Sequence, residues 1–66
     1  MINREDILEL LRADPFVPFE IQLTSGQGYR IEDPEGVSIP RNLVIREGEI
    51  TRIISLDHIE ELALIP

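Results

Sequence analysis

The side chains best suited to acid–base or metal chemistry stand near the end of the sequence. His58, the only histidine, has Asp57 before it and Glu60 and Glu61 shortly after it. A histidine with carboxylate neighbours can act as a general base or as a metal ligand. A single histidine beside acids in one helical turn is more often a solvated surface residue, and we favour that interpretation. The sequence therefore predicts no catalytic residue at this point.

Two other stretches could in principle bind ions or phosphates. Glu32-Asp33-Pro34-Glu35 offers carboxylate oxygens but lacks the spaced ligands of a calcium loop, so an acidic turn explains it equally well. Gly26-Gln27-Gly28 lies between predicted strands, with no helix N-terminus after it to receive a phosphate. We therefore expect no cofactor, no metal site and no enzymatic activity.

Three of the six arginines fall in the same half of the predicted sheet: Arg41, Arg46 and Arg52. A basic stripe on an acidic protein could meet an acidic partner or RNA. Glu47 and Glu49 stand among these arginines, however, and favour cross-strand ion pairs instead. The candidate partner-binding residues are Arg41, Arg46, Arg52, Ile54 and His58.

The charge is one-sided, with 13 acidic residues against 6 arginines and a net charge of -7. Such a surface repels phosphate backbones, which argues against nucleic-acid binding. The polar segment from Asn3 to Asp6 interrupts any signal-like apolar run, and no apolar stretch approaches the roughly 20 residues that span a bilayer. With no cysteine present, we expect a cytoplasmic protein that does not associate with membranes.

The length of 66 residues predicts a single domain, residues 1–66, with a thin core. A chain of this size buries only roughly 60% of the surface that its unfolded form exposes. Without cysteines, neither disulfides nor thiolate metal sites can add stability. Association with a second copy or with a protein partner remains the common way to cover apolar surface.

The chain is organised around Pro15-Phe16-Val17-Pro18-Phe19-Glu20-Ile21-Gln22-Leu23. Its apolar residues alternate from Phe19 through Ile21 to Leu23, which predicts a strand with one buried face. Before it, the spacing predicts a helix over residues 4–13, with Asn3 as N-cap and Asp6 completing a capping box. The stripe of Ile7, Leu8, Leu10 and Leu11 should pack on the sheet.

The predicted strands span residues 18–24, 28–33, 37–40, 43–46, 49–56 and 60–65. For the first hairpin, a three-residue loop pairs Leu23 with Tyr29 and Ile21 with Ile31, which keeps apolar residues on one face. For the later hairpin, a two-residue loop at Glu47-Gly48 pairs Ile45 with Ile50 and Arg46 with Glu49.

The last third contains two less regular features. The adjacent Ile53 and Ile54 break strict alternation, so we expect either that both faces are covered there or that a bulge shifts the phase. Asp57-His58-Ile59 reads as one helical turn capped by Asp57, and it precedes the final strand.

These elements predict an α+β fold, with a short N-terminal helix packed on a small, strongly bent antiparallel sheet or barrel of five to six strands. The order of elements, with a helical turn before the last strand, is similar to that of SH3-like and Sm-like small barrels. The pattern from Pro15 to Leu23, with Gly26 and Asp33-Pro34-Glu35 after it, resembles a group of short uncharacterised bacterial proteins. That resemblance implies a bacterial origin and carries over no catalytic residue. Asp33 stands where members of the group often have a histidine.

Three functions follow as hypotheses. The first is a small noncatalytic interaction module that acts through self-association or a protein partner. The second is an Sm-like nucleic-acid-binding protein, suggested by the element order and the arginines. The third is a small metal-dependent domain, suggested only by His58 and its acidic neighbours.

Overall fold

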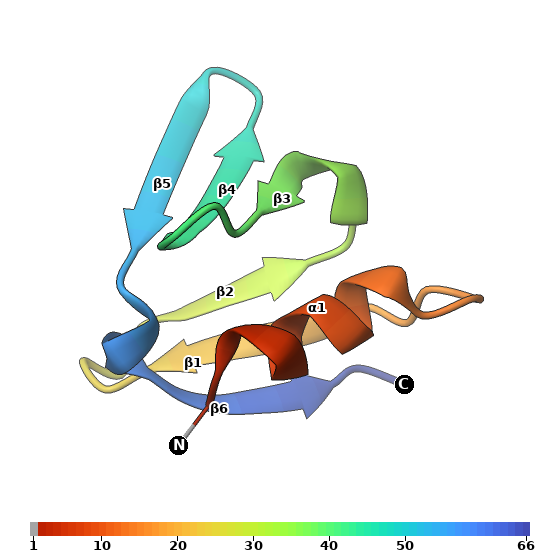
Figure 1. Cartoon of the computed structure of the whole chain (residues 1–66), viewed down its shortest axis with the longest axis horizontal. Helices are drawn as coiled ribbons and strands as arrows, with labels where there is room; N and C mark the ends of the chain where they lie inside the picture. Colours follow the sequence, from red (N-terminus) through yellow and green to blue (C-terminus); the bar gives the residue numbers. More distant parts are fainter. Residues whose placement is uncertain (1) are drawn as a thin grey trace.

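The computed structural model describes residues 2–66 and contains one helix followed by six short strands. The elements are α1 (Arg4–Arg12), β1 (Phe19–Leu23), β2 (Gly28–Ile31), η1 (Pro34–Gly36), β3 (Val37–Ser38), β4 (Leu43–Glu47), β5 (Ile50–Ile54), η2 (Leu56–His58) and β6 (Ile59–Leu64), where η marks a 3-10 turn. The strands form two antiparallel three-stranded sheets, in the orders β2-β1-β6 and β3-β4-β5 (Figure 1). The predicted α+β class is confirmed.

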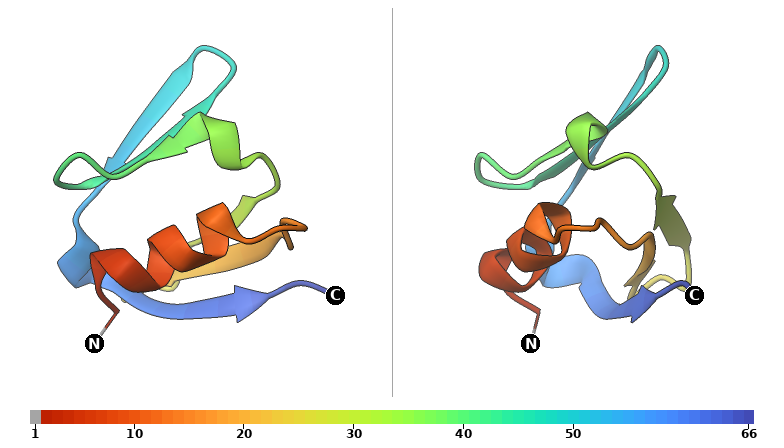
Figure 2. Two further views of the ribbon diagram at one scale, coloured as in Figure 1. Left: turned by 45° about the vertical axis from the view of Figure 1, so that its right-hand side comes forward. Right: turned by 90° about the vertical axis from the view of Figure 1, so that its right-hand side faces the viewer.

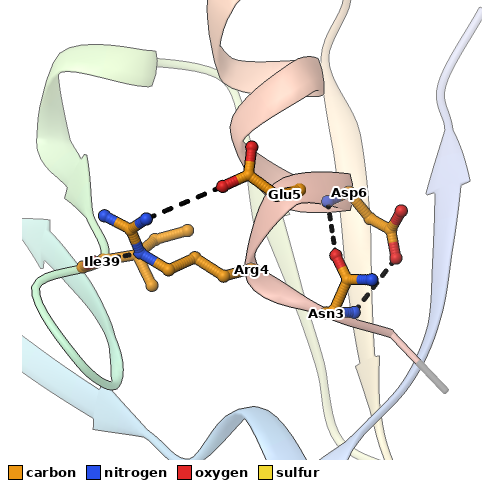
Figure 3. Close-up of polar contacts among 5 residues, drawn as sticks. All are labelled: Asn3, Arg4, Glu5, Asp6 and Ile39. Atoms are coloured by element: carbon orange, nitrogen blue, oxygen red, sulfur yellow. Dashed lines mark hydrogen bonds and ion pairs between the residues drawn. The ribbon is translucent and has the colours of Figure 1, made fainter.

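The start of α1 is fixed by the capping box that the sequence predicts. The side-chain Oδ1 of Asn3 accepts a hydrogen bond from the Asp6 backbone N–H at 3.1 Å, and the Asp6 carboxylate accepts one from the Asn3 N–H at 3.0 Å (Figure 3). Such a cap stabilises a helix by about 1 kcal/mol. The helix ends at Arg12, before the Asp14-Pro15 dipeptide, because a residue that precedes proline is disfavoured in helical conformation.

The helix packs against the core that the two sheets share. Figures 1 and 2 show α1 lying over β1 and below the β3-β4-β5 sheet. Ile7 is fully buried, while Leu8, Leu10 and Leu11 are half-buried against the same cluster, as the apolar stripe predicts. The Arg4 side-chain Nε also donates a hydrogen bond to the Ile39 carbonyl at 2.9 Å (Figure 3). This bond ties the first turn of the helix to the segment that follows β3.

Strand β1 is the centre of its sheet and shows the predicted alternation. Phe19 and Ile21 are fully buried and Leu23 is 8% exposed, whereas Glu20 and Gln22 lie on the other face. Strand β2 pairs with one edge of β1 and β6 with the other edge. The shared core is completed by Leu43, Ile45 and Ile54 from the second sheet, by Ile39 from the segment after β3, and by Ile31 and Ile59 from the first sheet.

The register of the first hairpin differs from the predicted one by two residues. Ile21 lies opposite Tyr29 and Phe19 opposite Ile31, so the predicted pairs Leu23–Tyr29 and Ile21–Ile31 are wrong. The loop still has three residues, but they are Thr24, Ser25 and Gly26. A three-residue hairpin loop needs a positive φ at its third position, and Gly26 supplies it with φ 93°. The predicted loop would have placed Gln27 there.

The β4–β5 hairpin is displaced in the same way. Ile45 lies opposite Arg52 and Arg46 opposite Thr51, so the predicted pairs Ile45–Ile50 and Arg46–Glu49 are wrong. Its two-residue loop is Gly48-Glu49, and Gly48 has φ 59°. The two-residue turns favoured in hairpins require a positive φ at the first loop position. A loop at Glu47-Gly48 would have forced a glutamate into that conformation.

Two further predictions in the last third are wrong. The β4–β5 ladder runs from the pair Leu43–Ile54 to the pair Glu47–Ile50 without a register shift, so no bulge separates Ile53 from Ile54. Ile54 is 8% exposed and Ile53 is 68% exposed, so only one face is covered there. The turn before β6 is capped by the Ser55 hydroxyl, which accepts from the Asp57 N–H, rather than by Asp57.

Several predicted strands are shorter than expected because turns begin inside them. Strand β2 ends at Ile31, before Asp33 caps η1, and β5 ends at Ile54, before Ser55 caps η2. Strand β3 has two residues and stops before Pro40. Among residues 2–66, no helix is both long enough and apolar enough to cross a membrane.

A conservative truncation in β1 tests the importance of the shared core. Ile21→Val removes one methylene group from a fully buried side chain and should lower the free energy of unfolding by about 1 kcal/mol. Ile50→Val, at a side chain that is 55% exposed, is the matched control and should change it by less than about 0.5 kcal/mol. Urea denaturation measures both. Equal effects of the two substitutions would contradict the described position of β1.

Candidate interaction surface

The outer face of the β3-β4-β5 sheet presents an apolar pair near its centre. Val44 and Ile53 lie directly opposite each other on β4 and β5, and directly opposite residues point to the same face. Ser38 on β3 lies opposite Val44, and Arg46 lies opposite Thr51 two pairs further toward the hairpin loop, on the same face. We call these five residues the Ile53 surface: Ser38, Val44, Arg46, Thr51 and Ile53.

Exposure distinguishes this surface from the inner face of the same sheet. Ile53 is 68% exposed, ahead of Leu64 at 61% and Ile50 at 55%, while Val44 is half-buried. On the inner face, Leu43 and Ile45 of β4 are almost completely buried. The exposed apolar atoms of Ile53 are therefore a site where a partner could remove apolar area from water.

The five predicted partner-binding residues do not form one cluster. Arg46 is exposed on the outer face of β4, and Arg41 is exposed in the β3–β4 connection. Arg52 and Ile54 share the inner face of β5 with the core. His58 is exposed at the end of η2, where its backbone carbonyl accepts a hydrogen bond from the Thr24 N–H at 2.8 Å. The arginines thus occupy both faces of the sheet and a loop.

Arg52 makes intramolecular contacts that link the two sheets. Its guanidinium carbon lies 5.0 Å from the centroid of the Tyr29 ring, which belongs to β2. Its Nε is buried and lies 3.8 Å from a carboxylate oxygen of Glu47, beyond hydrogen-bond distance. A cation over an aromatic ring contributes about 0.5–1 kcal/mol where the site is partly solvated. Arg52 therefore acts as a contact between β5 and β2.

The space between the ends of the two sheets forms a small cleft of about 160 Å³. Its apolar residues are Ile31, Val37 and Ile45, and its rim carries charged side chains: Arg30, Glu32, Asp33, Arg46 and Glu47. Two of these, Arg30 and Glu32, already pair with each other at 2.9 Å. Pockets for small molecules and cofactors usually measure about 300–1,000 Å³, so this cleft is small for such a ligand.

A second depression, of about 350 Å³, lies on the β2-β1-β6 sheet and is lined by Gln22, Glu60 and Glu61. Its lining is one amide and two carboxylates, without the apolar walls of a typical ligand site. The Gln22 amide also donates to the carboxylate of Glu20. Within residues 2–66, no three histidine, aspartate or glutamate side chains lie close enough together to hold a metal ion.

The sequence drew attention to Ile53 as a break in alternation, but the predicted partner-binding residues did not include Ile53, Thr51 or Val44. A signal for Ile53 was present, because two adjacent isoleucines in a regular strand must point to opposite faces. One of them therefore faces outward unless the outer face is also covered. Val44 carried the same signal, since it stands between the apolar Leu43 and Ile45 and must point to the opposite face from both.

No protein-family model, curated protein or solved structure matches this chain. The candidate surface consequently depends on the geometry described above.

The contact between Arg52 and Tyr29 makes a testable contribution to stability. Arg52→Gln removes the cation and should lower the free energy of unfolding by about 0.5–1 kcal/mol. Arg46→Gln is the matched control on the adjacent strand, and because Arg46 is exposed it should change the value by less than about 0.5 kcal/mol. Urea denaturation at low protein concentration distinguishes them. If Arg52→Gln is no worse than Arg46→Gln, the contact does not stabilise the fold.

Proposed function

We propose that this protein is a small noncatalytic interaction module that acts through self-association or a protein partner, with the Ile53 surface as its contact. The observation that supports this most directly is the exposure of Ile53 at 68% in the middle of a regular strand. Fully burying an isoleucine side chain contributes roughly 1.5–3 kcal/mol. Ile53 is therefore an apolar anchor that a partner could cover, with the half-buried Val44 opposite it.

The composition of the surroundings supports a protein contact over a catalytic role. Thr51 and Ser38 are small and uncharged, and Arg46 is the one charged residue of the Ile53 surface. Protein interfaces typically have an apolar centre with polar residues and arginine around it. The Ile53 surface has this arrangement on a small scale.

The proposal includes a specific type of fold, a small barrel. The order of a helix, two hairpins and a 3-10 turn before the last strand, together with β1 between β2 and β6, supports an SH3-like or Sm-like small barrel. Small barrels of this type carry their ligand sites on loops and sheet faces and need no deep pocket. A cytoplasmic location and the likeness to short bacterial proteins also remain proposals.

The two alternative functions have weaker support. A nucleic-acid binder needs clustered cations, and Arg41, Arg46 and Arg52 do not share one face of a chain whose net charge is -7. A metal-dependent domain based on His58 needs further ligands near it, and the side chains within residues 2–66 do not provide a group of three.

Replacing the anchor with a polar residue of smaller size tests the proposal. Sedimentation of the wild-type protein from about 10 µM to about 1 mM should show association, and Ile53→Ser should weaken it by about tenfold or more, because the apolar area to be covered is lost. Val17→Ser, at a side chain that is 39% exposed outside the Ile53 surface, is the control and should leave association unchanged.

The protein-partner route needs a second measurement. Wild-type protein and Ile53→Ser are used side by side as bait in the same cell extract, and bound proteins are quantified by mass spectrometry. A specific partner should be recovered by the wild-type protein and lost with Ile53→Ser. The proposal is contradicted if the wild-type protein stays monomeric and every bound protein is recovered equally by the two baits.

A further inference from the structure

The free edge of β5 presents backbone groups as well as the Ile53 side chain. The hairpin turn from Glu47 to Ile50 places these two residues in a hydrogen-bonded pair. Hydrogen-bonded and non-hydrogen-bonded pairs then alternate along an antiparallel ladder. The pairs Arg46–Thr51 and Val44–Ile53 are then the non-hydrogen-bonded ones. Consistent with this, Val44 uses its other side to pair with Ser38 of β3. The N–H and C=O groups of Thr51 and Ile53 therefore point away from β4, to a side where Figure 1 shows no further strand.

The other three sheet edges carry features that discourage pairing with another chain. Strand β3 has only two residues and is followed by Pro40, and β2 begins with Gly28 and carries the ion pair of Arg30 with Glu32. Strand β6 has a register irregularity against β1 and two exposed carboxylates, Glu60 and Glu61. Short strands, proline, charges and bulges are the usual means of protecting an edge.

Strand β5 has almost none of these protections. Its five residues, Ile50 to Ile54, include no proline, glycine or carboxylate, and four of them are β-branched and suited to strands. Its ladder with β4 is regular. The one charged residue, Arg52, points to the inner face, where Tyr29 and Glu47 already accompany it. An inward-pointing charge is itself an edge protection, and Arg52 is the one that β5 carries.

We propose that β5 pairs antiparallel with β5 of a second copy of this chain, about a two-fold axis at Ile53, so that the two sheets join into one. This inference depends on the proposed function and specifies how self-association occurs. The two free backbone positions allow three two-fold registers, centred on Thr51, Arg52 or Ile53. Centring on Arg52 would set two arginines directly opposite, which is unfavourable. Centring on Thr51 would set Glu49 opposite Ile53.

The register centred on Ile53 places apolar side chains together and keeps the two copies of Arg52 from lying opposite each other. It brings the two exposed Ile53 side chains side by side on the outer face and sets Arg52 opposite Ile54 of the second copy. Thr51 then lies opposite Ser55 of the second copy, whose backbone is extended with φ -66° and ψ 135° and whose carbonyl also accepts the His58 N–H of its own chain at 3.0 Å. No carboxylate lies between Ile50 and Ile54. The acidic side chains nearest to the paired segment are Glu49 and Asp57, which this register brings to its two ends. A two-fold pair is also closed, which limits assembly to a dimer.

Single cysteine variants test the register, because the native chain has no cysteine. In the proposed pair the two residues at position 53 are directly opposite, with Cα atoms about 5.5 Å apart, within the range for a disulfide. At about 1 mM protein, which offsets the apolar area lost with the substitution, Ile53→Cys should form a covalent dimer under mild oxidation at least about tenfold faster than Ile50→Cys. The two copies of residue 50 would lie roughly 20 Å apart at about 3.3 Å per residue. Both positions are exposed, so neither variant should disturb the fold.

A backbone variant tests the mode of association. Thr51→Pro removes an N–H that points to the free edge and no hydrogen bond to β4, so the dimer should weaken by about tenfold or more in sedimentation at about 0.15 M salt. Circular dichroism establishes that this variant is folded. If Thr51→Pro is unfolded, the crosslinking rates of Ile53→Cys and Ile50→Cys alone decide whether the copies pair through β5.

Three results would overturn the edge pairing. One is a wild-type protein that remains monomeric at about 1 mM, a concentration at which a pair of even weak affinity forms; a partner that depends on Ile53 would then still support the proposed function. Another is an assembly of three or more copies. The last is a dimer in which Ile53→Cys is crosslinked no faster than Ile50→Cys, which leaves self-association intact but places it elsewhere.

Discussion

One thin core serves the helix and both sheets of this protein, and the remaining structure depends on it. Ten hydrophobic side chains within residues 2–66 are buried, and no polar side chain is buried with them. Ile7 comes from α1, Phe19 and Ile21 from β1, and Leu43 and Ile45 from β4. Because no element contributes more than three of these residues, none has an independent hydrophobic core. The helix and the two sheets must form together.

Polar contacts orient the elements around this core at several points. The Arg4 side chain joins the start of α1 to the Ile39 carbonyl, and the Arg52 guanidinium lies over Tyr29 of the other sheet. The His58 carbonyl receives the Thr24 N–H, which joins η2 to the first hairpin. Each contact contributes only about 0.5–3 kcal/mol. Their positions matter more than their strengths, since each links segments that lie far apart in the sequence.

The small size of the domain also explains why some apolar surface remains exposed to solvent. A small domain has a high ratio of surface to volume, so it cannot cover both faces of two sheets with one nine-residue helix. The helix covers the inner side, and the outer face of β3-β4-β5 retains Ile53 with Val44 opposite it. The acidic residues keep other parts of the surface polar. The strand with the least edge protection and the exposed isoleucine are thus the same element, β5, which connects the proposed function with the inferred dimer.

The sequence alone determined the helix with its cap, the inward face of β1 and the odd length of the first loop. These features depend on local spacing, and residues such as Asn3, Asp6, Phe19 and Ile21 express it directly. The registers of both hairpins required the tertiary structure. Alternation has a period of two residues, so a slip by two leaves every side chain on its predicted face and changes only its partner. The positive φ angles of Gly26 and Gly48 selected the actual partners.

The candidate surface was decided by tertiary structure for the same kind of reason. The sequence brought Arg41, Arg46, Arg52, Ile54 and His58 close together along the chain. The pleat of β4 and β5 then separated them, turning Arg52 and Ile54 inward and leaving Arg46 outside. Which of Ile53 and Ile54 faces water depends on where the other sheet and α1 lie. Spacing along one strand specifies two opposite faces, but only packing specifies which of them is covered.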